Sequence, residues 1–257
     1  MTVNGRDPLL AALGELAEDP PRGIVDIVFS DWMLASSAFG EVYVAFNGHG
    51  VDFLRPVEVV GDDAEFAEEF HRELQRPLRA AEQAPSGLLT SLRRNRTRSV
   101  QVDLRHLSVF ERAVLEAVRA IPVGQTRPYS WVAREIGRPR AVRAVGSALG
   151  RNPVPLLIPC HRVTRSDGEP GDYVFGTAVK ERLLRSEEVD LDEVRALARS
   201  DVFYLGSDTT NIVCFPTCHN ARRISAPHRR GFRSVEAAQA AGYRPCKHCR
   251  PALAGSA

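Results

Sequence analysis

Long apolar runs are absent from this sequence of 257 residues. No uninterrupted apolar stretch reaches the roughly 18 residues that a membrane-spanning helix needs. Residues 1–20 lack the basic start and the long apolar core of a secretory signal peptide. These absences argue against a membrane protein and against secretion. We therefore expect a cytoplasmic protein with no membrane partner.

Cysteine is scarce and odd in number. Five cysteines in a chain without a secretion signal argue against a disulfide framework. One of them, Cys160, stands alone, and the other four lie together within residues 214–249.

Net charge is small, at +2, but it is distributed unevenly. Residues 1–105 carry 11 basic and 17 acidic side chains, whereas residues 106–165 carry 10 arginines and 3 glutamates. Residues 201–257 carry 8 basic and 3 acidic side chains. Such basic zones predict phosphate-facing surfaces, because Lys and Arg supply most non-specific affinity for nucleic acids. Ordinary solvated faces are the alternative.

The acidic part shows patterns of strands and helix without visible chemistry. Residues 23–55 alternate apolar and polar side chains around "FNGHG", which predicts an antiparallel hairpin. Residues 62–80 have the spacing of a helix, and residues 99–104 are typical of a short strand. The basic run at 93–99 is interpreted as an exposed loop, with phosphate contact as the alternative.

Two short helices follow a helix that begins at Val109. The turn between them contains Gly137 and Pro139, which predicts a helix-turn-helix. An ordinary helical hairpin in a core is the alternative. The second helix carries small outward residues beside Arg140 and Arg143, so a narrow groove is a reasonable target. These small residues are Ala144, Gly146, Ser147 and Ala148.

The segment "LLIPCHRV" at 156–163 places a thiol between an apolar and a cationic neighbour. Pro159 holds the backbone stiffly just before Cys160, which suits a nucleophile better than a packing residue. The thiolate is the reactive form, and His161 could accept the thiol proton. Glu187 and Glu188 are candidates to orient His161. Spacing alone supports this Cys-His hypothesis weakly.

The four clustered cysteines form two close pairs. Three residues separate Cys214 from Cys218 and two separate Cys246 from Cys249, with 27 residues between the pairs. Two such pairs fit a tetrahedral zinc site, and the surrounding chain is too short to build much core without a metal. The sequence therefore predicts Zn²⁺ and no organic cofactor.

The segments "RAVGSALGRNPVP", "IPCHRV" and "DYVFGTAVKERLLRSE" closely resemble the O6-alkylguanine-DNA alkyltransferases, also called methylated-DNA–protein-cysteine methyltransferases, and the resemblance covers roughly residues 23–188. It implies a ribonuclease-H-like domain followed by a helical domain that holds a helix-turn-helix and the active site. It also implies that Cys160 takes the alkyl group, that His161 acts through a water and that Glu187 orients His161. Asn152 matches the asparagine that braces the site.

The same resemblance assigns residues to the DNA and to the base pocket. Arg143 matches the residue that fills the space left by the extruded base, and Tyr129 matches the tyrosine that presses the adjacent phosphate. Tyr173, Phe175 and Pro159 are expected at the pocket. Because Phe175 is bulky, methyl groups should transfer much faster than benzyl groups. The expected DNA-facing set is Arg140, Arg143, Ala144, Gly146, Ser147 and Arg151, with Tyr129.

Residues 202–252 resemble the metal-binding domain of the bacterial protein Ada. The resemblance implies that Cys214 is both a zinc ligand and an acceptor of methyl groups from DNA phosphotriesters, with basic side chains holding the backbone. These are Arg222, Arg223, Arg229 and Arg230. A structural or DNA-docking zinc domain is the alternative, because the domain follows the alkyltransferase here but precedes it in Ada.

The sequence thus predicts an α/β (α+β) protein. We expect a ribonuclease-H-like domain over 1–105, an alkyltransferase helix-turn-helix and active-site domain over 106–190, a linker over 191–201 and an Ada-like zinc domain over 202–257. The expected activity is a single-turnover transfer of an alkyl group from O6-alkylguanine in double-stranded DNA to Cys160, by a nucleoid-associated monomer. A non-enzymatic damage-recognition protein and a thiol hydrolase are the rival interpretations.

Overall fold

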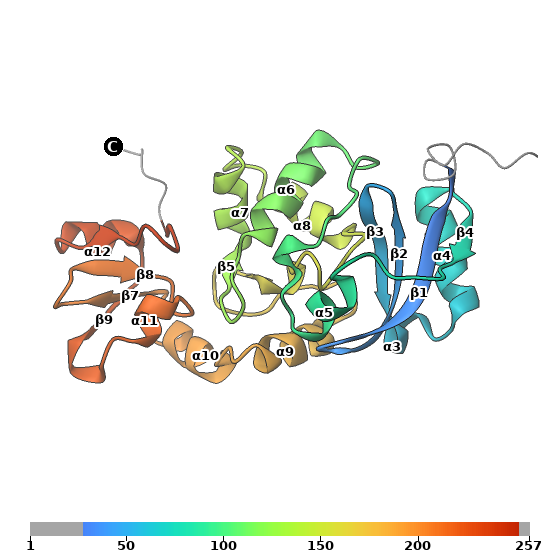
Figure 1. The fold of residues 1–257 in the computed structure, drawn as a ribbon. Helices are drawn as coiled ribbons and strands as arrows, with labels where there is room; N and C mark the ends of the chain where they lie inside the picture. Colours follow the sequence, from blue (N-terminus) through green and yellow to red (C-terminus); the bar gives the residue numbers. More distant parts are fainter. Residues whose placement is uncertain (1–27, 252–257) are drawn as a thin grey trace, which may run out of the picture.

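The structure, a computed structural model, describes residues 28–251. Its first layer is a four-stranded sheet of order β3-β2-β1-β4 (Figure 1). The strands β1 (Ser30–Ser37), β2 (Gly40–Asn47) and β3 (Gly50–Pro56) are antiparallel neighbours, and β4 (Leu78–Ala80) runs parallel to β1. The predicted hairpin at "FNGHG" joins β2 to β3. Residues 23–27 of the predicted strand region lie outside the described residues.

Strand alternation gives this sheet two apolar faces. Tyr43 and Ala45 point to the face covered by α4 (Asp63–Leu74), where they pack with Phe66 and Phe70. Val44 belongs instead to the main core that the sheet shares with the helical part. The helices α3 (Val57–Val60) and α5 (Leu88–Arg93) and the 3₁₀ turn η1 (Thr97–Ser99) complete this region.

The strand predicted over residues 99–104 is wrong in extent. Only Val102 pairs, in an isolated parallel bridge with Val51. Two hydrogen bonds hold it, from Val51 N to Gln101 O at 2.9 Å and from Asp103 N to Val51 O at 2.8 Å. The Asp103 carboxylate accepts bonds from the backbone and the side chain of Arg105, which turn the chain away from the sheet.

The helical part begins with α6 (Val109–Arg119), whose first turn is closed by a capping box between Ser108 and Glu111. The two predicted short helices are α7 (Tyr129–Glu135) and α8 (Val142–Gly150). The strands β5 (Arg127–Pro128) and β6 (Val163–Thr164) pair in parallel. Cys160 opens the 3₁₀ turn η2 (Cys160–Arg162), and α9 (Thr177–Ser186) follows.

The predicted linker forms a helix, α10 (Leu191–Arg199), which leads into a second small sheet. That sheet has the order β10-β8-β7-β9. Its elements are β7 (Tyr204–Ser207), β8 (Ile212–Cys214), α11 (His219–Arg222), η3 (Ala226–His228), β9 (Arg229–Phe232), α12 (Val235–Ala240) and β10 (Arg244–Pro245). Figure 1 shows this unit beside α7 and β5, on the far side of the helical part from β1 to β4.

The first sheet and the adjoining turn η1 form hydrogen bonds with the loop that precedes Cys160. The Leu54 amide donates to the carbonyl of Pro153 at 2.9 Å, and Arg55 Nη1 donates to the same oxygen at 3.0 Å. Thr97 Oγ1 donates to the Leu157 carbonyl at 3.3 Å. The acidic domain therefore fixes the segment on which the thiol depends.

No helix within residues 28–251 has the length and apolarity needed to cross a membrane.

Candidate active site and metal centre

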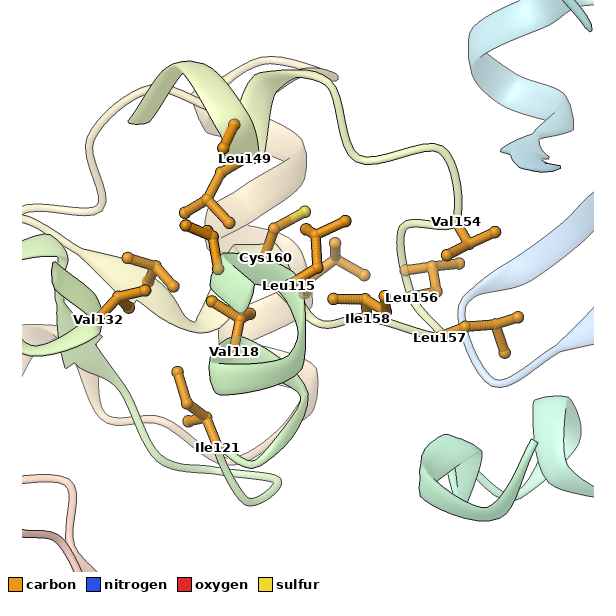
Figure 2. Close-up of a cluster of buried hydrophobic side chains, with 14 of the residues drawn as sticks. Leu115, Val118, Ile121, Val132, Leu149, Val154, Leu156, Leu157, Ile158 and Cys160 are labelled. Carbon is orange, nitrogen blue, oxygen red and sulfur yellow. The ribbon is translucent and has the colours of Figure 1, made fainter. Parts of the chain in front are cut away.

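Asn152 organises the loop that carries Cys160. Its Nδ2 donates to the Ile158 carbonyl at 2.9 Å and to Cys160 Sγ at 3.2 Å, and its Oδ1 accepts from the Val154 amide at 3.1 Å. The Asn152 side chain is buried, so each of these bonds is shielded from water. Figure 2 shows Cys160 among Leu115, Leu149 and Ile158. The Cys160 thiol is thereby held in one position against apolar side chains.

His161 and Glu187 form a buried pair next to the thiol. His161 Nε2 lies 3.1 Å from Glu187 Oε1, and neither side chain is more than 1% exposed. Arg162 also donates to Glu187, from Nε at 2.8 Å and from Nη2 at 2.7 Å. Of the two acids proposed from sequence, Glu187 contacts the imidazole, whereas Glu188 is exposed.

These contacts determine the protonation states of Glu187 and His161. Burial alone would raise the pKa of Glu187, but hydrogen bonds from His161 and Arg162 outweigh it and bring the pKa below the usual range. Burial lowers the pKa of His161, with Glu187 opposing in part, so the imidazole is neutral at pH 7. A neutral His161 donates Nε2–H to the Glu187 anion, and Nδ1 becomes a free acceptor. Nδ1 is buried without a hydrogen-bond partner among the described residues.

Cys160 rests as a thiol. The side chain is 3% exposed, and burial raises its pKa, while the hydrogen bond from Asn152 and the charge of Lys180 act in the opposite direction. A base is therefore required before the sulfur can act as a nucleophile. His161 Nδ1 has the protonation state for that task.

Cys160 lies in the wall of a cavity of about 350 Å³, within the range of ligand-binding pockets. Tyr129, Gly146 and Tyr173 contribute to the same wall. The Tyr129 hydroxyl donates to the Asp172 carbonyl at 3.3 Å. Burial raises the pKa of Tyr173 well above its ordinary value, so its hydroxyl keeps its proton. The cavity joins the thiol to the helix predicted to face DNA.

Sequence reasoning missed Lys180. This side chain is completely buried in α9, its Nζ donates to the Asp172 carbonyl at 3.2 Å, and it lies 5.7 Å from the Tyr129 ring and 6.0 Å from the Tyr173 ring. Burial lowers its pKa to about 8, opposed by the Cys160 charge. The signal was present in the spacing, because Lys180 shares a helix face with Leu184 and Glu187.

The predicted DNA-facing residues in α8 and directly beside it are mostly on the surface. Arg143 and Arg140 are exposed and have no ion-pair partner in the described part of the chain. Gly146 faces Tyr129, where an added Cβ would come 3.9 Å from the ring. Arg151 differs from the others because its Nε donates to Glu111 at 2.7 Å. Ala144 and Ser147 are also exposed, and Ala148 is buried.

Two predicted pocket residues lie outside the lining of this cavity. Phe175 packs edge-on against Tyr173, with ring centroids 5.4 Å apart, and so influences the pocket through that ring. Pro159 lines a different cavity of about 330 Å³ with Arg98 and Arg119. Val174, which was not predicted, lines the cavity beside the thiol.

The four clustered cysteines converge, and their sulfur atoms all lie within 4.8 Å of one another. All four side chains are buried, and Asn220 Nδ2 donates to Cys246 Sγ at 3.5 Å. A hydrogen bond from Cys214 lowers the pKa of the Cys218 thiol. Four converging thiols are the donor set of structural zinc, so these residues fit Zn²⁺.

Among the four, Cys214 borders a separate hollow of about 330 Å³. Arg223 lines it too, is exposed, and has no ion-pair partner within residues 28–251. Of the other predicted backbone-holding arginines, Arg229 pairs with Glu193 at 2.6 Å and Arg230 with Asp208 at 2.5 Å. Arg222 donates to the Glu188 carbonyl at 3.4 Å.

Comparison with known families gives a match for the part of the chain that carries Cys160 and another for the part that carries the four clustered cysteines. Residues 109–189 match the 6-O-methylguanine DNA methyltransferase DNA-binding domain, and residues 194–252 match the metal-binding domain of Ada. A methylated-DNA–protein-cysteine methyltransferase of Methanosarcina barkeri is 38% identical over 166 residues, which span 62% of this chain and 97% of the relative. The bifunctional transcriptional activator/DNA repair enzyme Ada of Escherichia coli is 36% identical over 166 residues, 61% of this chain but 45% of Ada.

Among solved structures, OGT of Mycobacterium tuberculosis in complex with DNA aligns with a TM-score of 0.51 and 29% identity, covering 64% of this chain and 98% of that one. A mixed α/β fold with a rigidly held cysteine, in a chain whose helical part matches a DNA-binding domain, is typical of enzymes that transfer a group from DNA to their own cysteine. The chain belongs to the methylated-DNA–protein-cysteine methyltransferase family of DNA-repair enzymes and carries an Ada-type zinc-binding domain. The family resemblance and the zinc site predicted from the sequence are confirmed.

Proposed function

We propose that Cys160 accepts an alkyl group from the O6 atom of guanine in double-stranded DNA, and that each chain acts once. The observation that carries this proposal is the position of Cys160 in the cavity wall, beside the neutral His161 that Glu187 orients. A base extruded from the duplex into such a cavity would meet a sulfur already fixed by Asn152.

In the proposed reaction, His161 Nδ1 removes the thiol proton through a water. The sulfur then attacks the alkyl carbon, so that an S–C bond forms while the C–O6 bond breaks and its electron pair stays with guanine. Guanine takes up one proton, so the thiol proton is exchanged for the alkyl group overall. The Glu187 anion stabilises the imidazolium while it lasts. No step reopens the thioether, which accounts for a single turnover.

The exposed face of α8, which follows α7 across a short turn, supports the proposed docking on DNA. Arg143 is exposed and unpaired among the described residues, as a side chain that enters the space of the extruded base must be. Gly146 leaves room for close approach beside Tyr129. We propose that these helices act as a helix-turn-helix. The β3-β2-β1-β4 order, with β4 parallel to β1, supports the proposed ribonuclease-H-like topology.

The proposal is tested by incubating the full chain with DNA that carries radiolabelled O6-methylguanine. The parent should take up one label per chain, Cys214→Ala the same amount, and Cys160→Ala none. A labelled Cys160→Ala chain would refute the assignment of the acceptor. Catalytic loss of methyl groups from DNA without label on protein would favour the hydrolase, and binding without any methyl loss would favour a recognition protein.

We further propose that Cys214 accepts methyl groups from DNA phosphotriesters. The hollow beside Cys214 favours this function, because it gives one zinc-ligating sulfur a neighbouring cavity and an unpaired arginine, Arg223. Mass spectrometry of the Cys214 peptide, after incubation with methylphosphotriester DNA, should find a mass gain of one methyl group. An unmodified peptide would leave the domain a structural or docking role.

We propose that one monomer binds one lesion. The boundaries at residues 105, 190 and 201 and the location in the cytoplasm with the nucleoid stay predictions from the sequence.

A further inference from the structure

The zinc domain is docked on the strand and helix that carry part of the active-site wall. Trp131 of α7 donates from Nε1 to the Cys249 and Arg250 carbonyls, at 3.1 Å each. The Thr126 amide donates to Thr217 Oγ1 at 2.9 Å. Arg134 Nη2 donates to the Pro251 carbonyl at 3.0 Å. These bonds make residues 126–134 a platform for the cysteine cluster.

Arg127 is enclosed in this interface. The side chain is 2% exposed, although it bears a charge that ordinarily stays in water. Its guanidinium lies 5.3 Å from the ring of Phe215 and 5.7 Å from the ring of Trp131. Phe215 directly follows the first cysteine of the cluster, so the guanidinium is directed at the metal-binding unit from the neighbouring domain.

Within residues 28–251, no carboxylate forms an ion pair with this buried charge. Arg127 donates from Nη1 to the Thr126 carbonyl at 2.7 Å and from Nη2 to Gln125 Oε1 at 2.8 Å, and both acceptors are neutral. Its Nε has no partner, and within residues 28–251 Arg127 takes part in no ion pair with an acid. A buried unpaired charge is costly in a protein interior, so an anionic group close by is expected.

The cysteine cluster supplies that charge. Four thiolates around one Zn²⁺ carry a net charge of −2. Burial lowers the pKa of Arg127, and each of the four cysteines, once ionised, opposes this by raising it, Cys249 most strongly. The packing of the guanidinium over Phe215, the residue next to Cys214, and the direction of these charge effects together place Arg127 near the cluster.

We propose that Arg127, a residue of the alkyltransferase domain, is the counter-ion of the zinc tetrathiolate, so that metal occupancy stabilises the strand and helix beside the alkyl-acceptor pocket. Two connections lead from Arg127 to the pocket. Its strand β5 pairs with β6, which follows directly after the 3₁₀ turn of Cys160. Tyr129, two residues further along, lies in the cavity wall.

The proposal predicts a reciprocal dependence between the charge and the metal. With zinc bound, Arg127→Met leaves the tetrathiolate without its counter-ion, so the chain should unfold at a lower temperature than the parent. With zinc removed and the thiols protonated, Arg127 has no anion, so the same substitution should cost nothing or raise the unfolding temperature. A residue needed only for packing would lose stability equally in both states.

The experiment uses the full chain with zinc, or with a strong chelator and reductant. Thermal unfolding is recorded for the parent, Arg127→Met, Arg127→Lys and the matched control Arg134→Met. Arg134 crosses the same interface, but among the residues that the structure describes it donates only to the Pro251 carbonyl. Arg127→Lys keeps the charge and should retain much of the zinc-dependent stability, whereas Arg134→Met should change both states alike.

A second measurement keeps the proposal testable if the zinc-free chain unfolds. Competition with a chromophoric chelator gives the zinc dissociation constant of each variant. Arg127→Met should weaken zinc binding about 10- to 100-fold, the range found for partners of metal ligands, and Arg134→Met by much less. Equal zinc affinities in Arg127→Met and the parent, or equal losses of stability with and without zinc, would overturn the proposal.

Discussion

Replacing Lys180 with methionine should make the protein more stable and less active. Lys180 is fully buried, and burial lowers its pKa from 10.5 to about 8. At about 1.4 kcal/mol per pKa unit, that shift corresponds to a penalty of about 3 kcal/mol for carrying the charge at neutral pH. Methionine also loses the hydrogen bond to the Asp172 carbonyl, worth about 1 kcal/mol. The expected net gain is therefore about 2 kcal/mol.

The pH dependence identifies the cause. Because the pKa of Lys180 is lower in the folded chain than in the unfolded chain, its penalty is complete below pH 8. It shrinks as the pH rises from 8 to 10.5 and is absent above that. The advantage of Lys180→Met should therefore be largest at pH 6.5 and become, near pH 10.5, a disadvantage of no more than about 1 kcal/mol, because only the lost hydrogen bond to the Asp172 carbonyl then counts. The same change should slow transfer about tenfold, since the Lys180 charge favours ionisation of Cys160.

Urea unfolding at pH 6.5, 8.5 and 10.5 gives the free energy of unfolding, and single-turnover methyl transfer gives the rate. Arg182→Met is the matched control on the same helix, because Arg182 is exposed and paired with Glu58 at the surface. It should change stability by no more than about 0.5 kcal/mol at any pH. A Lys180→Met chain that is less stable than the parent by the same amount at every pH would refute the reasoning.

Three further outcomes are expected. Glu187→Gln should cost about 3 kcal/mol at pH 7 by leaving Arg162 without its anion. The cost should fade in acid unfolding curves as the pH drops below 4.5, because the unfolded chain then binds a proton at Glu187 that the native carboxylate does not bind. Gly124→Ala should lower the free energy of unfolding by more than about 2 kcal/mol, because φ of Gly124 is 72° and the new Cβ would lie 2.8 Å from the Glu187 carbonyl oxygen. Gly87→Ala is the control: its φ is 76° but the space around it is open, so it should lower the free energy of unfolding by only about 1 kcal/mol. Phe175→Gly should narrow the ratio of methyl to benzyl transfer rates measured with matched oligonucleotides, and an unchanged ratio would separate Phe175 from adduct size.

The parts of the site that the sequence predicted are those with local signals. Cys160 and His161 are adjacent, and the fixed spacing of two cysteine pairs is itself the signature of a zinc site. Lys180 and Arg127 were missed because a lone cation in a sequence is normally a surface residue. Helical spacing does place Lys180 on one face with Leu184 and Glu187, but it does not encode the burial of either cation by segments far away in the chain.

Secondary structure shows the same limit. The helix α4 has strong periodicity and an Asp62 cap, and it formed over most of the predicted range, but it ends at Leu74, and residues 78–80 of the predicted helix form the strand β4 instead. The segment at 99–104 has the composition of a strand, but its neighbours let only Val102 pair. The predicted linker became α10, with Asp190 as its cap and Leu191 buried beneath it.

The two hydrogen bonds that the Pro153 carbonyl accepts from β3 mean that the helical part, which carries Cys160, depends on the first sheet for its structure. A truncated chain starting at residue 106 would strip both donors, Leu54 and Arg55, from an oxygen one residue after Asn152. Fusing the helical part to a different N-terminal domain would therefore keep every active-site residue and still lose the contacts that fix the position of the Cys160 sulfur.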